Sequence, residues 1–176
     1  MKKILKKMFC CFPLIGIASC SSLDNIDRST VQQLDLNRYS GQWYEIARMD
    51  HSFEKGLVGC TAQYSIQKDG SIKVINAGFK NSLDGKYKVS EGKAKRPDAN
   101  EPGKLKVSFF LWFYSDYNVL ELANDYRYVL VGSKSADYLW ILSRSPQMDP
   151  DDLHYLLECA QQRGYDTDKL IWVKHQ

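Results

Sequence analysis

The sequence of 176 residues has few prolines, glycines and histidines, and it lacks the short motifs of common enzymes. Its five prolines and 11 glycines make up about 9% of the chain, which is typical of a globular domain and excludes a collagen-like or disordered chain. No Gly-rich phosphate loop, nucleophile elbow or Cys-x-x-Cys pair is present. The histidines, His51, His154 and His175, lack metal-ligand spacing and are expected at the surface. We therefore predict no enzyme, no catalytic residue, no cofactor and no metal site.

The longest uncharged run lies near the N-terminus and is short. Four lysines within residues 1–7 precede a mostly apolar stretch at 8–19, which is shorter than the ~20 residues that span a bilayer. This pattern predicts an export signal over residues 1–19. Its removal takes away four lysines and no acidic residue, so the net charge changes from +3 to −1. The mature chain is therefore not basic, and we expect no nucleic-acid partner.

Residues 16–20, Gly-Ile-Ala-Ser-Cys, resemble the lipobox of bacterial lipoproteins. The resemblance implies acylation of Cys20, and Ser21 resembles the outer-membrane sorting signal. Multiple acyl chains give a firm anchor, and the polar residues 20–36 suit a tether. We expect a lipid-anchored protein of the cell outer membrane, on its periplasmic face, with a plain secretory signal as the alternative.

Two further cysteines remain in the mature chain, Cys60 and Cys159. An oxidising compartment would allow them to pair. On a helical projection Cys159 lies at the edge of an apolar face. We favour two separate thiols and keep a Cys60–Cys159 bridge as the alternative.

From Gly41 onward, short alternating runs rich in Val, Ile, Tyr, Phe and Trp are separated by turn signals such as Asp-Gly. Consecutive strands with short links predict an eight-stranded antiparallel up-and-down β-barrel, an all-β fold that closes its own edges. Asp149, Pro150 and Gly164 have the positions of a helix cap, start and stop, which predicts one C-terminal helix. A short extra strand is expected at 170–173, and the barrel domain is assigned to residues 37–176. The predicted barrel strands are 42–48, 60–67, 71–80, 86–95, 104–113, 117–123, 126–132 and 137–144.

An eight-stranded barrel is wide enough either to be filled by side chains or to hold one small ligand. A set of large apolar side chains on the predicted strands favours an apolar cavity, although each one alone is equally consistent with core packing. The mouth loop with His51, Glu54 and Lys55 would reach a ligand head group, and Arg48 or Lys55 could pair with a phosphate. The ligand-binding candidates are Val74, Phe79, Tyr87, Val107, Phe109, Trp112, Tyr128 and Trp140.

Three sequence blocks resemble the lipocalin signature. Gly41-Gln42-Trp43 begins the first strand, Asn124-Asp125-Tyr126 lies between two strands, and Arg144 ends the last strand. The resemblance implies a lipocalin barrel whose floor is closed by Trp43, with the Arg144 guanidinium across its ring and Gly41 allowing close approach. An arginine over a tryptophan ring adds cation–π attraction to the burial of a large ring.

Longer runs resemble the bacterial outer-membrane lipocalins, which are similar to apolipoprotein D-like lipocalins. They include residues 43–48, 50–57, 105–110 and 137–144. The resemblance implies a fatty acid or lysophospholipid ligand, stored or transported for envelope maintenance, especially under stress. One departure is Leu111-Trp112, where that subfamily usually has Gly-Pro, and this pair affects the shape of the mouth.

Two other functions remain open. Some lipocalins are enzymes with an inward thiol, and Cys60 would take that role here. A filled barrel would instead serve as a structural or interaction lipoprotein, with residues 110–117 contacting a protein or membrane. A homodimer is also left open.

Overall fold

The computed structural model of the chain describes residues 25–175. The predicted signal peptide and Cys20 lie outside the described residues.

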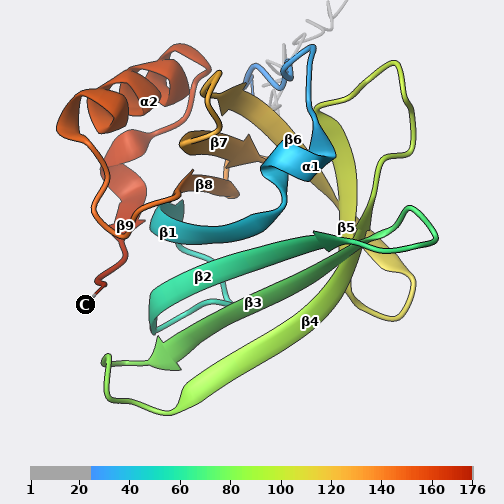
Figure 1. The fold of residues 1–176 in the computed structure, drawn as a ribbon. Coiled ribbons are helices and arrows are strands. Elements are labelled where there is room, and N and C mark those ends of the chain that lie inside the picture. The colour runs from blue at the N-terminus through green and yellow to red at the C-terminus, as the bar shows by residue number, and fades with distance from the viewer. Residues whose placement is uncertain (1–24, 176) are drawn as a thin grey trace, which may run out of the picture.

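Eight antiparallel strands form a closed barrel, in which each strand pairs with the next and β1 pairs with both β2 and β8 (Figure 1). This confirms the predicted fold class. A ninth strand, β9 (Leu170–Trp172), pairs with β1 at Ala47–Met49. The barrel strands are β1 (Gly41–Met49), β2 (Leu57–Ile66), β3 (Ile72–Lys80), β4 (Tyr87–Lys95), β5 (Lys104–Phe110), β6 (Phe113–Leu122), β7 (Tyr128–Gly132) and β8 (Leu139–Ser143).

Helix α2 (Pro150–Gln162) covers the outer wall of the barrel, whereas the short helix α1 (Leu36–Tyr39) lies before β1 at the closed end (Figure 1). The side chain of Asp149 accepts a hydrogen bond from the Asp151 amide, which satisfies one of the free donors at the start of α2. Gly164 follows the helix with φ of +92°, a conformation that favours glycine. A 3-10 helix (Thr167–Lys169) leads into β9. Within residues 25–175, no helix has the length and apolarity needed to cross a bilayer.

Two apolar clusters lie on the two sides of the barrel wall. The inner cluster includes Trp43, Val74 and Leu105. The outer cluster lies between the wall and α2, and it includes Leu130 and Leu156. Strand alternation places successive side chains in one cluster or the other.

A bulge in β1 changes this alternation. The register between β1 and β8 shifts between Glu45 and Ala47. Ile46 and Ala47 consequently both belong to the outer cluster, while Arg48 contacts Glu45 and Cys60. A bulge re-aims the side chains that follow it, and here it brings Arg48 to the inner side of the wall, where alternation from Trp43 already places Glu45.

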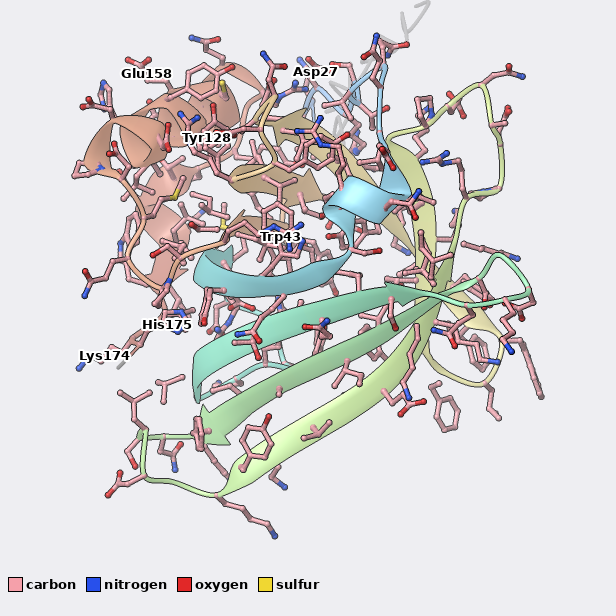
Figure 2. All side chains as sticks on the ribbon, in the orientation of Figure 1. Asp27, Trp43, Tyr128, Glu158, Lys174 and His175 are labelled. Atoms are coloured by element: carbon pink, nitrogen blue, oxygen red, sulfur yellow. The ribbon has the colours of Figure 1, made fainter. Side chains whose placement is uncertain are left out.

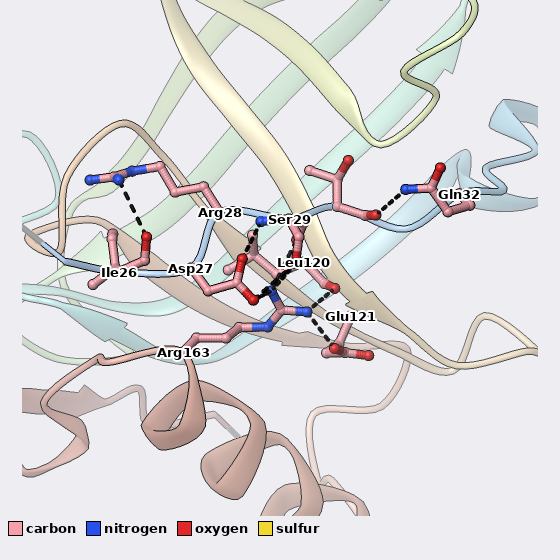
Figure 3. Close-up of polar contacts among 9 residues, drawn as sticks. Ile26, Asp27, Arg28, Ser29, Gln32, Leu120, Glu121 and Arg163 are labelled. Atoms are coloured by element: carbon pink, nitrogen blue, oxygen red, sulfur yellow. Dashed lines mark hydrogen bonds and ion pairs between the residues drawn. The ribbon is translucent and has the colours of Figure 1, made fainter.

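The segment before α1 is fixed across the outside of β6 (Figure 3). Arg163, at the end of α2, donates hydrogen bonds to the backbone oxygens of Ser29 and Leu120 and forms ion pairs with Asp27 and Glu121. The Asp27 amide in turn donates to the Arg163 carbonyl oxygen at 2.9 Å. The polypeptide that leads to the N-terminus therefore leaves the domain beside α2 and the closed half of β6.

Candidate functional site: the barrel floor and lumen

Trp43 and Arg144 close one end of the barrel. The Trp43 ring is fully buried, and its Nε1–H donates to the Tyr39 carbonyl oxygen at 2.9 Å. The Arg144 guanidinium carbon lies 3.8 Å from the centre of a Trp43 ring. The same guanidinium donates to the backbone oxygens of Arg38, Tyr39, Ser40 and Gln42. This single side chain thus ties α1 and the start of β1 to the end of β8.

Gly41 allows the close approach of that guanidinium. Its φ is +98°, and a Cβ atom there would lie 3.2 Å from Arg144 Nη1. A side chain at this position would therefore be strained and would crowd the arginine.

Above the floor, the lumen is apolar and narrow. A small cavity is lined by side chains from α1 and from β2 to β6, and Tyr39, Tyr64 and Tyr117 join their hydroxyl groups there at distances of 2.6 and 3.0 Å. Burial raises the pKa of all three tyrosines, so the hydroxyls stay neutral. The apolar lining consists of Leu36, Ile72, Ala94, Leu105 and Val107.

One wall of the lumen is charged. Arg48 Nη1 donates to Glu45 Oε1 at 2.6 Å, and Arg48 Nη2 donates to the carbonyl oxygens of Glu54 and Leu57. The Glu54 carboxylate accepts a hydrogen bond from Trp140 Nε1 at 3.0 Å and lies 2.9 Å from His51 Nε2. We call Glu45, Arg48, His51 and Glu54 the lumen charge cluster; all four are buried. The expectation of a wholly apolar lumen was therefore wrong for this wall.

The two carboxyl groups of the cluster differ in protonation. Burial and the nearby charge of Glu54 raise the pKa of Glu45 to about 8, against the opposing effect of Arg48. Burial also acts to raise the pKa of Glu54, but hydrogen bonds from His51 and Trp140 hold it below its usual value. At neutral pH the cluster thus holds a protonated Glu45 beside an ionised Glu54.

The lumen opens to solvent toward the other end. On the inward face of β4, Gly92 and Ala94 are buried. Ser90 and Lys88 continue the same alternation toward the mouth and are exposed. The barrel is therefore filled near its floor and open above Gly92.

Four of the predicted ligand-binding residues lie on the inner side. Val74 is buried in the inner cluster, and Val107 lines the floor cavity. The Phe109 ring covers Gly92, where a Cβ atom would lie 2.7 Å from it. Trp140 packs on the inner cluster and donates to Glu54. Whether these residues touch a ligand stays a prediction.

The other four lie elsewhere, which corrects the predicted lining. Phe79 and Tyr87 pair across β3 and β4 with the opposite alternation to Val74, and so lie on the outer face. Tyr128 packs under α2 with its ring centre 6.1 Å from that of Tyr155 (Figure 2). Trp112 lies at the tip of the β5–β6 hairpin and is 73% exposed. Strand boundaries alone did not reveal which way each ring points.

Sequence reasoning also misplaced the polar residues of the lumen. Arg48 was a candidate for a ligand phosphate, but its guanidinium is already bound by Glu45 and two carbonyl groups. His51 was expected at the surface and is instead buried against Phe53, with ring centres 3.9 Å apart. Glu45 was not singled out, although alternation from the inward Trp43 places it on the inner face; the inward position of its partner Arg48 depends on the β1 bulge, for which the sequence gives no signal.

The two cysteines are free thiols, so the alternative of a bridge is wrong. Cys60 lies in the lumen beside Arg48, and Cys159 is on α2 outside the barrel. Burial raises the pKa of Cys60 to about 12, which keeps the thiol protonated and weakly nucleophilic. Among residues 25–175, no group of three or more His, Cys, Asp and Glu side chains is arranged to hold a metal ion.

Comparison with known proteins agrees with this geometry. The sequence profile described as Lipocalin-like domain matches residues 34–175. The outer membrane lipoprotein Blc of Escherichia coli K12 is 47% identical over 146 residues, which cover 83% of this chain and 82% of that protein. The Blc protein of Vibrio cholerae is 44% identical over 147 residues, which cover 83% and 85%.

More distant proteins share the same domain. Bovine apolipoprotein D is 36% identical over 147 residues, covering 79% of this chain and 76% of that protein. The solved structure of insecticyanin from the tobacco hornworm matches with a TM-score of 0.68 at 20% identity, over 85% of each chain. The bacterial relatives place this chain at the outer membrane as a lipid-anchored protein. With the closed barrel, the Trp43–Arg144 floor and these matches taken together, the chain belongs to the lipocalin family.

Proposed function

We propose that the barrel binds a single-chain amphipathic lipid, a fatty acid or a lysophospholipid, and stores or transports it for envelope maintenance, especially under stress. The observation that carries this proposal is the gradient along the lumen. The floor is apolar and aromatic, the charge cluster lies on one wall, and Lys88 and Ser90 face the open end. A lipid with one tail and a polar head has the same gradient.

The apolar part of the lumen supplies the affinity. Each methylene removed from water contributes ~0.8 kcal/mol, so about ten buried methylenes give roughly 8 kcal/mol before the costs of association. The floor cavity is narrow and is lined by side chains of α1 and of β2 to β6, which favours a ligand with one tail over a bulkier one.

The lumen charge cluster contributes less to the affinity for a lipid than to the choice of its head group. Because the Arg48 guanidinium already donates to Glu45 and to two backbone carbonyl groups, few of its N–H groups are left for a ligand. The exposed Lys88 is the inward-facing cation of β4 at the open end and is free to meet a carboxylate or phosphate. A head group held there would lie in water at the open end, and its tail would point into the lumen toward the floor.

Filling the floor tests this proposal. Ala94 lines the cavity, whereas Ala77 has the opposite alternation on the neighbouring strand β3 and faces outward. We expect Ala94→Phe to weaken binding of a lysophospholipid at least tenfold and Ala77→Phe to leave it unchanged. The measurement is a titration of tryptophan fluorescence, with circular dichroism to confirm that both variants fold.

Native mass spectrometry of detergent-free protein purified from its own envelope then identifies the ligand. A co-purifying single-chain lipid supports the proposal. A bare chain that also fails to bind added lysophospholipid and fatty acid would contradict it, and would favour a filled barrel with a scaffolding role.

A further inference from the structure

The β5–β6 hairpin exposes a continuous apolar tip at the open end of the barrel. Phe110, Leu111, Trp112 and Phe113 are 68, 64, 73 and 64% exposed, respectively. The neighbouring rings stack on one another, with centres 6.3 Å apart for Phe110 and Phe113 and 6.2 Å apart for Trp112 and Phe113. A set of this size on one hairpin is unusual for a surface that contacts only water.

The backbone conformation at the tip is one that residues other than glycine seldom adopt. Leu111 has a φ of +50°, in the left-handed region that favours glycine. The chain therefore accepts backbone strain at a position where it gains no packing inside the domain. A contact outside the domain would explain why leucine stands there.

Strand β4, which pairs with β5 of this hairpin, is rich in lysine. Residues 86–106, which comprise β4, the loop after it and the first three residues of β5, contain seven Lys and Arg residues against three acidic ones, whereas the chain from Cys20 onward has a net charge of −1. Lys95 Nζ lies 4.4 Å from the centre of the Tyr114 ring, directly beside the tip. Exposed aromatic rings with a lysine beside them suit the interface between lipid head groups and acyl chains, and a lysine-rich strand next to them attracts anionic lipid.

We propose that the hairpin tip, Phe110–Phe113, inserts into the interface of a phospholipid bilayer that contains anionic lipid, and so brings the open end of the lumen against that bilayer. Phe109 lies next to the tip and points inward over Gly92, so a continuous apolar surface runs from the tip into the lumen. This contact is independent of what the lumen carries.

Quenching of Trp112 by brominated phospholipid tests the proposal on the full acylated chain in vesicles of phosphatidylcholine and phosphatidylglycerol. The brominated lipid is placed either in the same vesicles or in added acceptor vesicles, since the tip could reach either. We expect strong quenching in at least one arrangement, loss of the quenched component in Trp112→Phe, and weaker quenching when phosphatidylglycerol is omitted.

A second variant separates insertion from folding. The double substitution Leu111→Asn and Trp112→Gly suits the turn, because Asn tolerates positive φ, yet it removes the apolar tip. We expect this variant to fold and to lose association with acceptor vesicles, while Tyr155→Ser, which removes an exposed ring from α2, behaves as the wild type.

Three results would overturn the proposal: no quenching in either arrangement, equal quenching in Trp112→Phe, or a Trp112 environment that depends on protein concentration and not on lipid. The last result would assign the tip to contacts between copies of this chain. Lysophospholipid titration is measured separately, so failure of the membrane contact leaves the proposed cargo function standing, and the reverse also holds.

Discussion

Trp43 is held from several directions at once. Arg144 covers its ring, Tyr39 lies 5.1 Å away between ring centres, and its indole N–H is satisfied by a backbone oxygen. A buried indole with a satisfied donor contributes its full apolar area and leaves no polar atom without a partner. The barrel floor therefore depends strongly on one residue.

Trp43→Ala should accordingly destabilise the domain by about 3–5 kcal/mol, the range for truncating a large core side chain. The measurement is the free energy of unfolding in urea. Removal of the exposed Trp172 by Trp172→Ala is the matched control and should cost far less. Wild-type stability in Trp43→Ala would contradict the role of this ring as the floor.

Glu45 should make the stability of the domain fall as the pH rises. Its pKa is raised by folding to about 8, so the folded state binds a proton that the unfolded chain has already released above pH ~4.5. Between these two values the folded state loses up to about 1.4 kcal/mol per pH unit from this group. Glu54, whose pKa is lowered, acts in the opposite sense and only at lower pH.

Glu45→Gln should remove this slope. Urea unfolding of both proteins at about pH 5 and pH 8 measures it, and the variant should gain stability relative to the wild type as the pH rises. Glu158→Gln, at an exposed position on α2, should keep the wild-type slope. An unchanged slope in Glu45→Gln would mean that the Glu45 carboxyl is ionised throughout.

At the scale of elements, residue patterns predicted most of the fold. Alternating apolar runs and Asp-Gly turns placed all eight barrel strands, and the cap at Asp149, the proline after it and Gly164 placed α2. The lipocalin resemblance was needed to identify Gly41, Trp43 and Arg144 as one group, because Arg144 is close to the other two in space but more than 100 positions from them in the sequence. No local pattern could have joined them.

The errors at this scale also have physical reasons. The prediction that Phe79, Tyr87 and Tyr128 face inward failed because one residue of register decides the side of a strand. The lumen charge cluster was missed for the same reason, since the β1 bulge turns Arg48 inward. The hairpin turn at Leu111 was read as part of a strand, because nothing in an apolar run marks where it reverses.

At the scale of the molecule, the first described residues lie beside the closed half of β6, whereas the mouth is at the opposite end of that strand. We propose that Cys20 carries the acyl groups, as the sequence around it indicates. Cys20→Ala should then release the protein from the membrane fraction without changing the unfolding of the domain, which membrane fractionation and circular dichroism measure. Continued sedimentation with membranes would count against acylation at this position.

Arg163 fixes residues 27–29 to the outside of the domain through its contacts with Ser29 and Asp27. A tether from the proposed anchor at Cys20 would therefore meet the domain at this point. This point lies beside the closed half of β6, a strand of 10 residues that begins at Phe113 in the mouth and spans about 30 Å. If the domain rotates about this attachment point, the mouth moves through a distance comparable to the thickness of a bilayer. The attachment point itself does not move. With the proposed lipid cargo and the proposed acyl anchor, loading and unloading of the lumen would then occur at different surfaces while the protein stays attached to its membrane.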